Sequence, residues 1–100
     1  MIFIFVACAG KSEARKISTS LLKKKLVACT QIFPMESSYW WKGKIEHAKE
    51  WLVIAKSVER NFGRIKTEVK KLHSYEVPEI VAVDAEADED YKSWLASTLL

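Results

Sequence analysis

The side chains that could hold a metal ion are few and widely spaced in this sequence. Soft or borderline ligands are supplied by Cys8, Cys29, His47 and His73, with Met35 as a weaker thioether. No two of them form a Cys-x-x-Cys or His-x-x-x-His pair, the spacings typical of a local metal site. Each cysteine by itself is most simply interpreted as a small buried apolar residue. The local signal for a metal site is therefore weak.

A second group of reactive side chains follows His73. Tyr75, Glu76 and Glu79 come soon after it, so an imidazole, a phenol and two carboxylates share one short segment. Polar groups gathered on a loop can indicate a binding site. They can equally indicate a plain helix end, in which His73 complements the helix dipole and Glu79 pairs with a lysine. The residues alone leave both interpretations open.

The elements that must position these side chains follow from hydrophobic periodicity and turn residues. In chain order we expect a strand over 1–8, a helix over 12–25, strands over 27–41 and 44–56, a helix over 59–73, a strand after residue 78 and a helix over 88–100. Ser12 is the expected N-cap of the first helix. The second helix carries one apolar stripe, formed by Phe62, Ile65, Val69 and Leu72.

The two central strands are expected to form a hairpin. Lys42-Gly43 is a two-residue connection that ends in glycine, which is typical of a tight β-turn between paired strands. Pro34 lies inside the first arm and has no N–H to donate to a neighbouring strand. We therefore expect the first arm to be an edge strand, with a break or bulge near Pro34-Met35.

The order strand, helix, strand, strand, helix, strand is the split βαβ, or ferredoxin-like, arrangement with one additional helix at its end. Right-handed crossovers give an antiparallel sheet of order 4-1-3-2 with the helices on one face. We therefore predict an α+β, ferredoxin-like fold in one domain spanning residues 1–100. Cys8 would end the first strand and Cys29 begin the second, at opposite ends of the sheet and too far apart for a disulfide.

The hairpin arms are unusually long and aromatic. Strands are commonly ~5–6 residues long, whereas these arms span 15 and 13 residues. Two helices would leave the outer half bare, including Tyr39, Trp40, Trp41 and Trp51. A long apolar edge invites pairing with another chain. We therefore expect a symmetric homo-oligomer with these four aromatic residues at its interface.

Charge is distributed unevenly along the chain. Residues 76–100 carry a balance of −6, which leaves +9 for the first 75 residues. Basic regions attract phosphates, but charge runs more often mark solvated faces. An RNA-recognition module shares the strand order, yet it needs an aromatic octamer on its third strand. Here that strand is KIEHAKEWLVIAK, with two acids and one aromatic residue. No nucleic-acid partner is therefore expected.

Three further classes of protein are not favoured. Gly10-Lys11-Ser12 resembles the end of a phosphate-binding P-loop, but Phe5 stands where its first glycine belongs. No nucleophile–base pair is evident, so an enzyme is not expected. The longest apolar run, residues 1–9, is too short to cross a bilayer and lacks a basic leader. We expect a cytoplasmic protein without a membrane span.

Four segments resemble the CutA divalent-cation tolerance proteins. They are KKLVACTQIF, YWWKGKIE, KLHSYEVPEI and DEDYKSWL, which occur in the family's order and at its separations. The resemblance implies a ferredoxin-like protomer and a tight homotrimer, structurally akin to the PII nitrogen-signalling proteins. It also implies a link to tolerance of copper and other divalent metals, without an established catalytic activity.

The resemblance further implies site residues. Cys29 and His73 match positions offered as metal contacts in the family, with Cys8 a weaker candidate, and such a site would draw ligands from two subunits. A thiolate with an imidazole suits copper or zinc better than magnesium or calcium. A ligand cleft between subunits would be lined by Lys56, Tyr75, Glu79 and Trp41.

Two departures from the family pattern bear on this site. Ser74 stands where the family usually has proline, which makes the loop less rigid and frees a backbone N–H to donate. Met35-Glu36 replaces a segment that often carries glycine, which can change the bend after Pro34. The alternative function is a PII-like signalling or scaffold protein that binds an anionic metabolite or a partner protein, with metal incidental.

Overall fold

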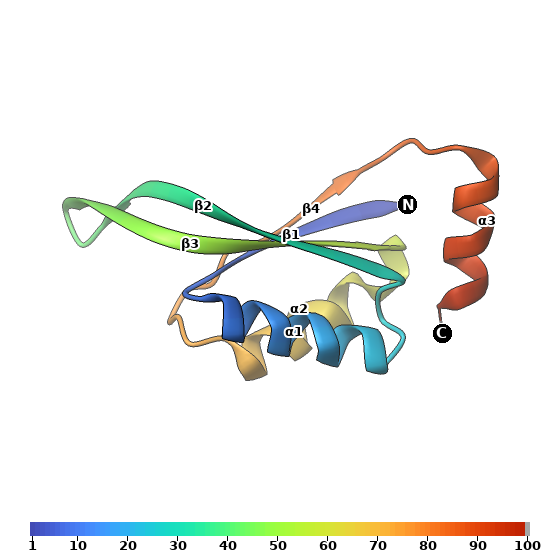
Figure 1. Ribbon diagram of the computed structural model, residues 1–100, viewed down its shortest axis with the longest axis horizontal. Coiled ribbons are helices and arrows are strands. Elements are labelled where there is room, and N and C mark those ends of the chain that lie inside the picture. Colours follow the sequence, from blue (N-terminus) through green and yellow to red (C-terminus); the bar gives the residue numbers. More distant parts are fainter. Residues whose placement is uncertain (100) are drawn as a thin grey trace.

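A computed structural model describes residues 1–99 and shows the element order expected from the sequence (Figure 1). The elements are β1 (Ile2–Cys8), α1 (Lys11–Lys23), β2 (Cys29–Trp41), β3 (Lys44–Ser57), the 3-10 helix η1 (Glu59–Asn61), α2 (Phe62–Leu72), β4 (Ile80–Asp84) and α3 (Glu89–Thr98). The expected final helical residue, Leu100, lies outside the described residues. None of the helices within residues 1–99 is long and apolar enough to cross a membrane.

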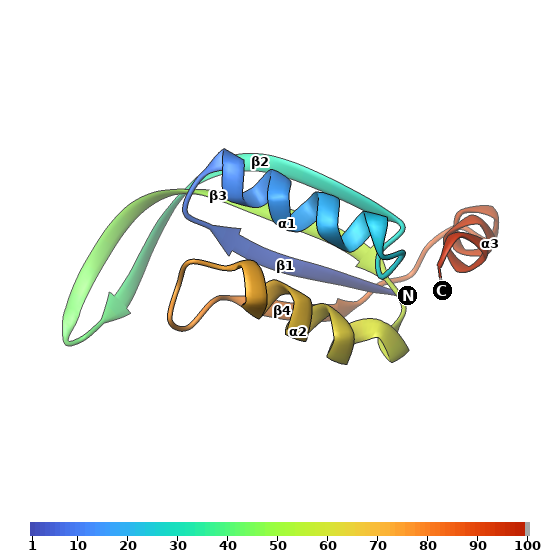
Figure 2. The same cartoon turned by 90° about the horizontal axis from the view of Figure 1, so that it is seen from below.

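The strands form one antiparallel sheet in the order β2-β3-β1-β4, which confirms the predicted ferredoxin-like α+β fold. β1 is central because it pairs with β3 on one side and β4 on the other. Both α1 and α2 lie against the same face of this sheet (Figures 1 and 2). β2 and β4 are left as the two edges of the chain's own sheet.

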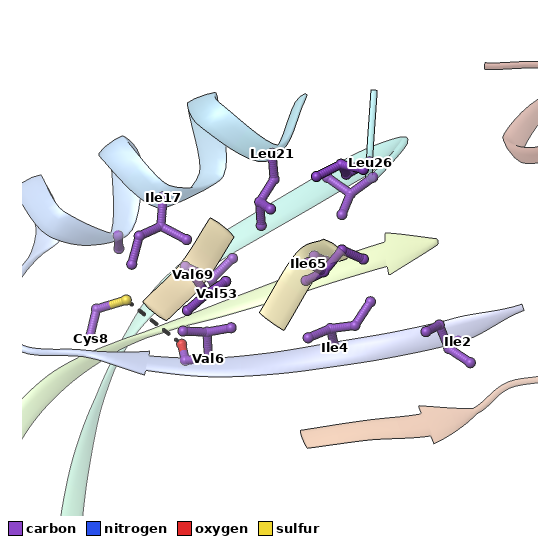
Figure 3. Packing of buried hydrophobic residues seen from close by; sticks show 13 residues of the cluster. Ile2, Ile4, Val6, Cys8, Ile17, Leu21, Leu26, Val53, Ile65 and Val69 are labelled. Carbon is purple, nitrogen blue, oxygen red and sulfur yellow. Dashed lines mark hydrogen bonds between the residues drawn. The ribbon is translucent and has the colours of Figure 1, made fainter. Parts of the chain in front are cut away.

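The core lies between that face and the two helices. Figure 3 shows Ile17 and Leu21 of α1 directed toward strand residues that include Val6 and Val53. α2 contributes Ile65 and Val69, while Phe62 and Leu72 pack against the rim of the cluster, so the predicted stripe is confirmed. Burial alternates from Ile2 to Val6 of β1 because successive side chains of a strand point to opposite faces, and Ala7 and Cys8 at its end are both buried.

The hairpin of β2 and β3 is continuous. Each residue from Cys29 to Trp41 has a partner in β3 in unbroken register, and Pro34 lies opposite Trp51. The expected break or bulge at Pro34 was therefore wrong. An edge strand uses only alternate N–H groups for pairing, so a proline whose nitrogen faces outward removes no bond from the ladder. The turn is as predicted: Lys42 and Gly43 have φ values of 50° and 80°.

The start of α1 differs from the expectation. The N-cap is Gly10, which has no side chain that could cap the helix, so the assignment of Ser12 as N-cap was wrong. Glu13 performs part of that task, since its Oε2 accepts the N–H of Ala9 at 3.1 Å. This arrangement is close to the capping box, in which an acid of the first turn reaches back to a free N–H.

Glu68 joins the two helices at the end remote from the hairpin. Its carboxylate accepts hydrogen bonds from Lys24 at 2.7 Å, Ser20 at 2.5 Å and Lys71 at 3.3 Å. The bonds from Lys24 and Ser20 outweigh burial and lower the pKa of Glu68 to about 2. This buried acid is thus compensated within the chain by groups from α1 and α2.

The second face of the sheet is open. Residues paired across the strands share a face, and Phe33, Val81 and Val83 are large apolar residues exposed there. The protein measures 44 × 25 × 21 Å with a radius of gyration of 14.0 Å, against about 13 Å for a compact domain of this length. The excess reflects the hairpin, which projects beyond the helices in Figure 2.

Candidate functional site

A cleft of 830 Å³ lies at the root of the hairpin. One wall is the outer part of the hairpin, and the other is the loop between α2 and β4. In Figure 2 the hairpin curves away to the side on which that loop lies. We call this the root cleft; it is lined by Ala7, Ser37, Ser38, Tyr39, Trp40, Trp41, Glu50 and residues 74–79. Its lining therefore comes from four separate segments of the chain, in β1, β2, β3 and the loop.

Glu50 lies deep in the root cleft with 4% of its surface exposed. The hydroxyl of Tyr75 donates to Oε2 of Glu50 at 2.7 Å. Burial, and then this bond, raise the pKa of Tyr75 above its ordinary value, so its hydroxyl remains a donor. The pair joins the loop to β3 and fixes the orientation of the glutamate.

Glu13 anchors the same loop from the start of α1. Its Oε1 accepts the backbone N–H of Ser74 at 2.6 Å, and its Oε2 accepts the Ser74 hydroxyl at 3.1 Å. Burial opposes ionisation, but the backbone bonds from Ser74 and Ala9 prevail and lower the pKa of Glu13. The N–H predicted to be free at Ser74 thus has a use that a proline could not supply.

His73 lies behind the loop with no exposed side-chain surface. Its Nε2 is 2.7 Å from the carbonyl oxygen of Ala7, and its Nδ1 accepts the N–H of Tyr75 at 3.1 Å. A neutral imidazole that satisfies both bonds carries its proton on Nε2. The Nδ1 atom also lies 3.4 Å from Oε1 of Glu13. Both ring nitrogens are therefore engaged in holding the loop to β1 and α1.

The predicted metal ligands are not brought together within one chain. Cys29 lies opposite Lys56, which in turn lies opposite Phe3. His73 contacts Ala7, four residues further along β1, which is about 13 Å of strand. Within residues 1–99 no group of three or more histidine, cysteine or acidic residues could hold a metal ion.

The two thiols differ in their surroundings. Both cysteines are free, with Cys8 buried and Cys29 partly exposed. Burial, followed by the charges of Glu13 and Glu50, raises the pKa of the Cys8 thiol to about 12. Because the thiolate is the metal-binding form, Cys8 is a poor ligand near neutral pH. Cys29 is the more accessible of the two.

Three of the four predicted cleft residues share the root cleft, namely Trp41, Tyr75 and Glu79. Lys56 does not join them. Its ammonium lies 5.3 Å from the ring centroid of Phe3 and 5.6 Å from that of Tyr91, over the open face near α3. Within one chain, then, the predicted cleft is two sites at opposite ends of the sheet.

The four predicted interface aromatics also divide. Tyr39, Trp40 and Trp41 are exposed on the outer hairpin, with 72% of Trp40 accessible. Trp51 is instead on the helix-covered side, where it packs against the core with the ammonium of Lys11 5.2 Å from its ring centroid. The expectation that Trp51 is left bare was wrong.

Sequence reasoning missed Glu50 and a hydroxyl–imidazole pair. Glu50 lies on the same face of β3 as the apolar residues Leu52 and Ile54, so nothing in the local sequence pattern marks it as a cleft residue. Ser38 Oγ lies 2.9 Å from Nδ1 of His47 on the exposed hairpin, although no nucleophile–base pair was evident in the sequence. The register, which places residues 38 and 47 opposite each other, is the signal that could have found it.

Comparisons with known proteins agree with this fold. The model of the CutA1 divalent ion tolerance protein family matches residues 2–98. A protein of Archaeoglobus fulgidus described as divalent-cation tolerance protein CutA is 40% identical over 98 residues, covering 97% of this chain and 96% of the relative. A chloroplastic CutA 1 of rice is 33% identical, covering 97% of this chain and 56% of that longer protein.

Solved structures show the same likeness. The divalent cation tolerance protein of Thermus thermophilus superposes with a TM-score of 0.95 at 34% identity, covering 99% of both chains. A structure from Archaeoglobus fulgidus, described as a periplasmic divalent cation tolerance protein, gives a TM-score of 0.94 at 40% identity and covers 98% of both. Together with the match of residues 2–98, these relatives show that the chain belongs to the CutA1 divalent ion tolerance protein family.

Proposed function

We propose that this protein is a homotrimeric divalent-cation tolerance protein, a single domain over residues 1–100, that binds copper or another divalent ion at clefts between subunits. The observation that best supports an oligomer is the apolar part of the sheet that the helices leave uncovered. β2 combines three such features. It is an edge strand of 13 residues, it borders the apolar open face, and it ends in an exposed tip with Trp40. Surfaces of this kind are usually covered by a partner chain.

The resemblance to CutA proteins implies that the assembly is a closed trimer. Its molar mass in solution tests this. Multi-angle light scattering should give about three times the chain mass of 11.5 kDa, and Trp40→Ala should shift the equilibrium toward smaller species on dilution. A folded 11.5 kDa particle at micromolar concentration would refute the trimer.

The metal part of the proposal requires ligands from two subunits. Cys29 is partly exposed on the open face that a neighbour would cover, so its thiol is the best placed soft ligand of the chain. His73 is less suitable than the sequence suggested, because both ring nitrogens already have partners. A metal ion would have to displace the bond to Ala7 or the bond from Tyr75. A thiolate with imidazole or carboxylate groups favours copper or zinc.

Cysteine variants test the metal site with a built-in control. Calorimetric titration with copper should show binding by the reduced wild-type protein and at least tenfold weaker binding by Cys29→Ser. Cys8→Ser should bind as the wild type does, because that thiol is buried and protonated. Equal binding by Cys29→Ser, or none by the wild type, would remove Cys29 from the site.

We propose no catalytic role. The Ser38–His47 pair has no further hydrogen-bond partner for the imidazole among the described residues, whereas a hydrolytic base is normally oriented by a third group. Ester hydrolysis no faster for the wild type than for Ser38→Ala would support this. The cytoplasm is our proposed compartment, to be checked by cell fractionation, since one relative is described as periplasmic and others as chloroplastic.

A PII-like role with an anionic ligand has one observation in its favour. Lys56 faces two aromatic rings, and no carboxylate pairs with it in residues 1–99. An ammonium of this kind beside a subunit boundary could bind an anion. Titration with inorganic phosphate, compared between wild type and Lys56→Gln, would discriminate, because the metal proposal expects no response in either protein.

A further inference from the structure

The root cleft has the charge of a cation site. Three carboxylates, those of Glu50, Glu76 and Glu79, line it, and none of its lining residues is basic. The chain as a whole carries +3, so the acidic lining is a local feature and not a reflection of overall charge. A concave acidic surface attracts cations and repels phosphates and carboxylates.

Glu50 lacks a counter-ion. Within residues 1–99 its one hydrogen-bond partner is the neutral hydroxyl of Tyr75, and no lysine, arginine or histidine pairs with it. No described side-chain oxygen is both sealed from solvent and unbonded, so the second oxygen of Glu50 keeps access to the cleft. A carboxylate buried to this extent is unfavourable unless a positive charge compensates it.

Aromatic rings make up much of the remaining wall. Tyr39, Trp41 and Tyr75 line the cleft together with the acids. Aromatic faces attract ammonium groups and pack against methylene chains. Trp41 already illustrates the first property, because the ammonium of Lys42 lies 5.6 Å from its ring centroid. The faces of these rings offer no ligand atoms to a bare metal ion, and no metal-binding cluster of histidine, cysteine or acidic residues occurs among residues 1–99.

We propose that the root cleft binds an alkyl diamine or polyamine. One ammonium group bonds to the free oxygen of Glu50, the methylene chain lies along the aromatic wall, and a second ammonium pairs with Glu76 or Glu79 at the exposed rim. The volume of 830 Å³ suits a small organic ligand. The proposal rests on the proposed function in treating this cleft as a ligand site, but it needs neither copper nor Cys29.

The test is calorimetric titration of the trimer, or of whatever assembly forms in solution, with 1,5-diaminopentane. The wild type should bind it at least tenfold more tightly than 1-aminopentane, which has one charge. Glu50→Gln should weaken diamine binding at least tenfold, because the amide keeps the size and the acceptor for Tyr75 but removes the charge. Tyr75→Phe should have a smaller effect, since it keeps the ring and loses the hydroxyl that orients Glu50.

The matched control is Glu46→Gln. Glu46 lies on the same strand, β3, but is exposed and does not line the cleft, so the same loss of charge should leave binding unchanged. Raising the salt concentration should weaken the binding that remains in Glu50→Gln as well as binding by the wild type, because the ammonium paired with Glu76 or Glu79 at the exposed rim is screened in both. Circular dichroism and light scattering on each variant establish that fold and assembly are intact.

Three results would overturn the proposal. They are absence of diamine binding by the wild type at millimolar concentration, equal binding by Glu50→Gln, and equal damage by Glu46→Gln. If wild-type protein binds no diamine while Glu50→Gln dissociates the oligomer, a lysine of a second copy supplies the cation instead, which also refutes it. Copper titration in parallel separates the two proposals, because loss of diamine binding with copper binding and trimer mass intact refutes this inference alone.

Discussion

Glu68 and Glu50 are both nearly buried, with 7% and 4% of their surfaces exposed, in surroundings of opposite character. Glu68, between α1 and α2, receives bonds from two lysines and a serine. Glu50, at the root of the hairpin, receives one bond, from a neutral tyrosine. A glutamate side chain is thus paired with cations in one region, at Glu68, and has no cationic partner in the other, at Glu50.

The difference separates structural from functional burial. A buried acid that finds its cations inside the chain links two helices and needs nothing further. A buried acid without one weakens the free protein, and uncompensated groups of this kind cluster at functional sites. The helix-covered end of the molecule is self-sufficient in this sense, whereas the hairpin end exposes Trp40, leaves β2 unpaired on one side and holds Glu50 uncompensated.

The largest expected effect comes from the two tryptophans that represent these regions. Trp51→Ala should lower the free energy of unfolding by about 3 kcal/mol, because the ring packs against the core. That loss should be similar at all protein concentrations. Trp40→Ala should cost little at high concentration and progressively more on dilution, since its ring is exposed until subunits meet. Thermal unfolding over a hundredfold concentration range would show whether the two behave alike, which would contradict the comparison.

Glu68→Gln and Glu50→Gln each replace a buried carboxylate by a neutral amide, one in each of the two regions. Loss of charge at Glu68 should cost about 1–2 kcal/mol of stability, because its charged hydrogen bonds weaken. Glu50→Gln should leave the unfolding midpoint in denaturant unchanged or higher, since it removes a buried charge that no cation opposes. If both variants lose equal stability, Glu50 is as well compensated as Glu68 in solution.

The contribution of Glu68 should also depend on pH in a defined direction. Its pKa is lowered from 4.5 in an unperturbed chain to about 2 in the folded protein. The stabilisation is therefore complete above pH 4.5 and is lost as the pH falls through about 2. Denaturant unfolding of wild type and Glu68→Gln should differ most above pH 5 and converge toward pH 2. A constant difference between pH 6 and pH 3 would show that the charge of Glu68 is not the cause.

The smallest effect is expected at the end of α1, close to Glu68. Lys25 adopts a φ of 55° there, a conformation that favours glycine, while the N–H of Leu26 donates to the carbonyl of Leu21 at 3.1 Å. Lys25→Gly should stabilise the protein by about 0.5–1 kcal/mol. Lys23→Gly, inside the helix, should destabilise it by about 1 kcal/mol. Melting temperatures that shift the same way in both variants would exclude the conformational explanation.

The parts of the fold that sequence reasoning predicted depend on local signals. The stripe of Phe62, Ile65 and Val69 follows from helical periodicity, and the turn at Lys42-Gly43 from the need for positive φ. The errors arose where another interaction in the folded protein overrode the preference of a single residue type. Ser12 is a good capping residue by type, but the N-cap lies two residues earlier, at Gly10, and Glu13 reaches back to the N–H of Ala9 instead.

The candidate site was only partly predictable. The motif around Tyr75 and Glu79 marked the loop, and the hairpin aromatics marked the opposite wall. Glu50 escaped notice because strand alternation places it among apolar residues, and only the Tyr75 hydroxyl explains its position. Lys56 lies at the other end of the sheet within one chain, so its place in a cleft between subunits stays a prediction.

By itself, the sequence determined the element order, the sheet topology and the excess length of the hairpin, because periodicity, turn chemistry and chain connectivity are local or nearly local properties. Tertiary structure decided which buried charges have an opposite charge nearby. Whether a buried carboxylate has a cation nearby depends on residues far apart in the chain, as with Lys24 and Glu68, and on side-chain directions that no spacing encodes. That is why two similar glutamates have opposite surroundings in one small protein.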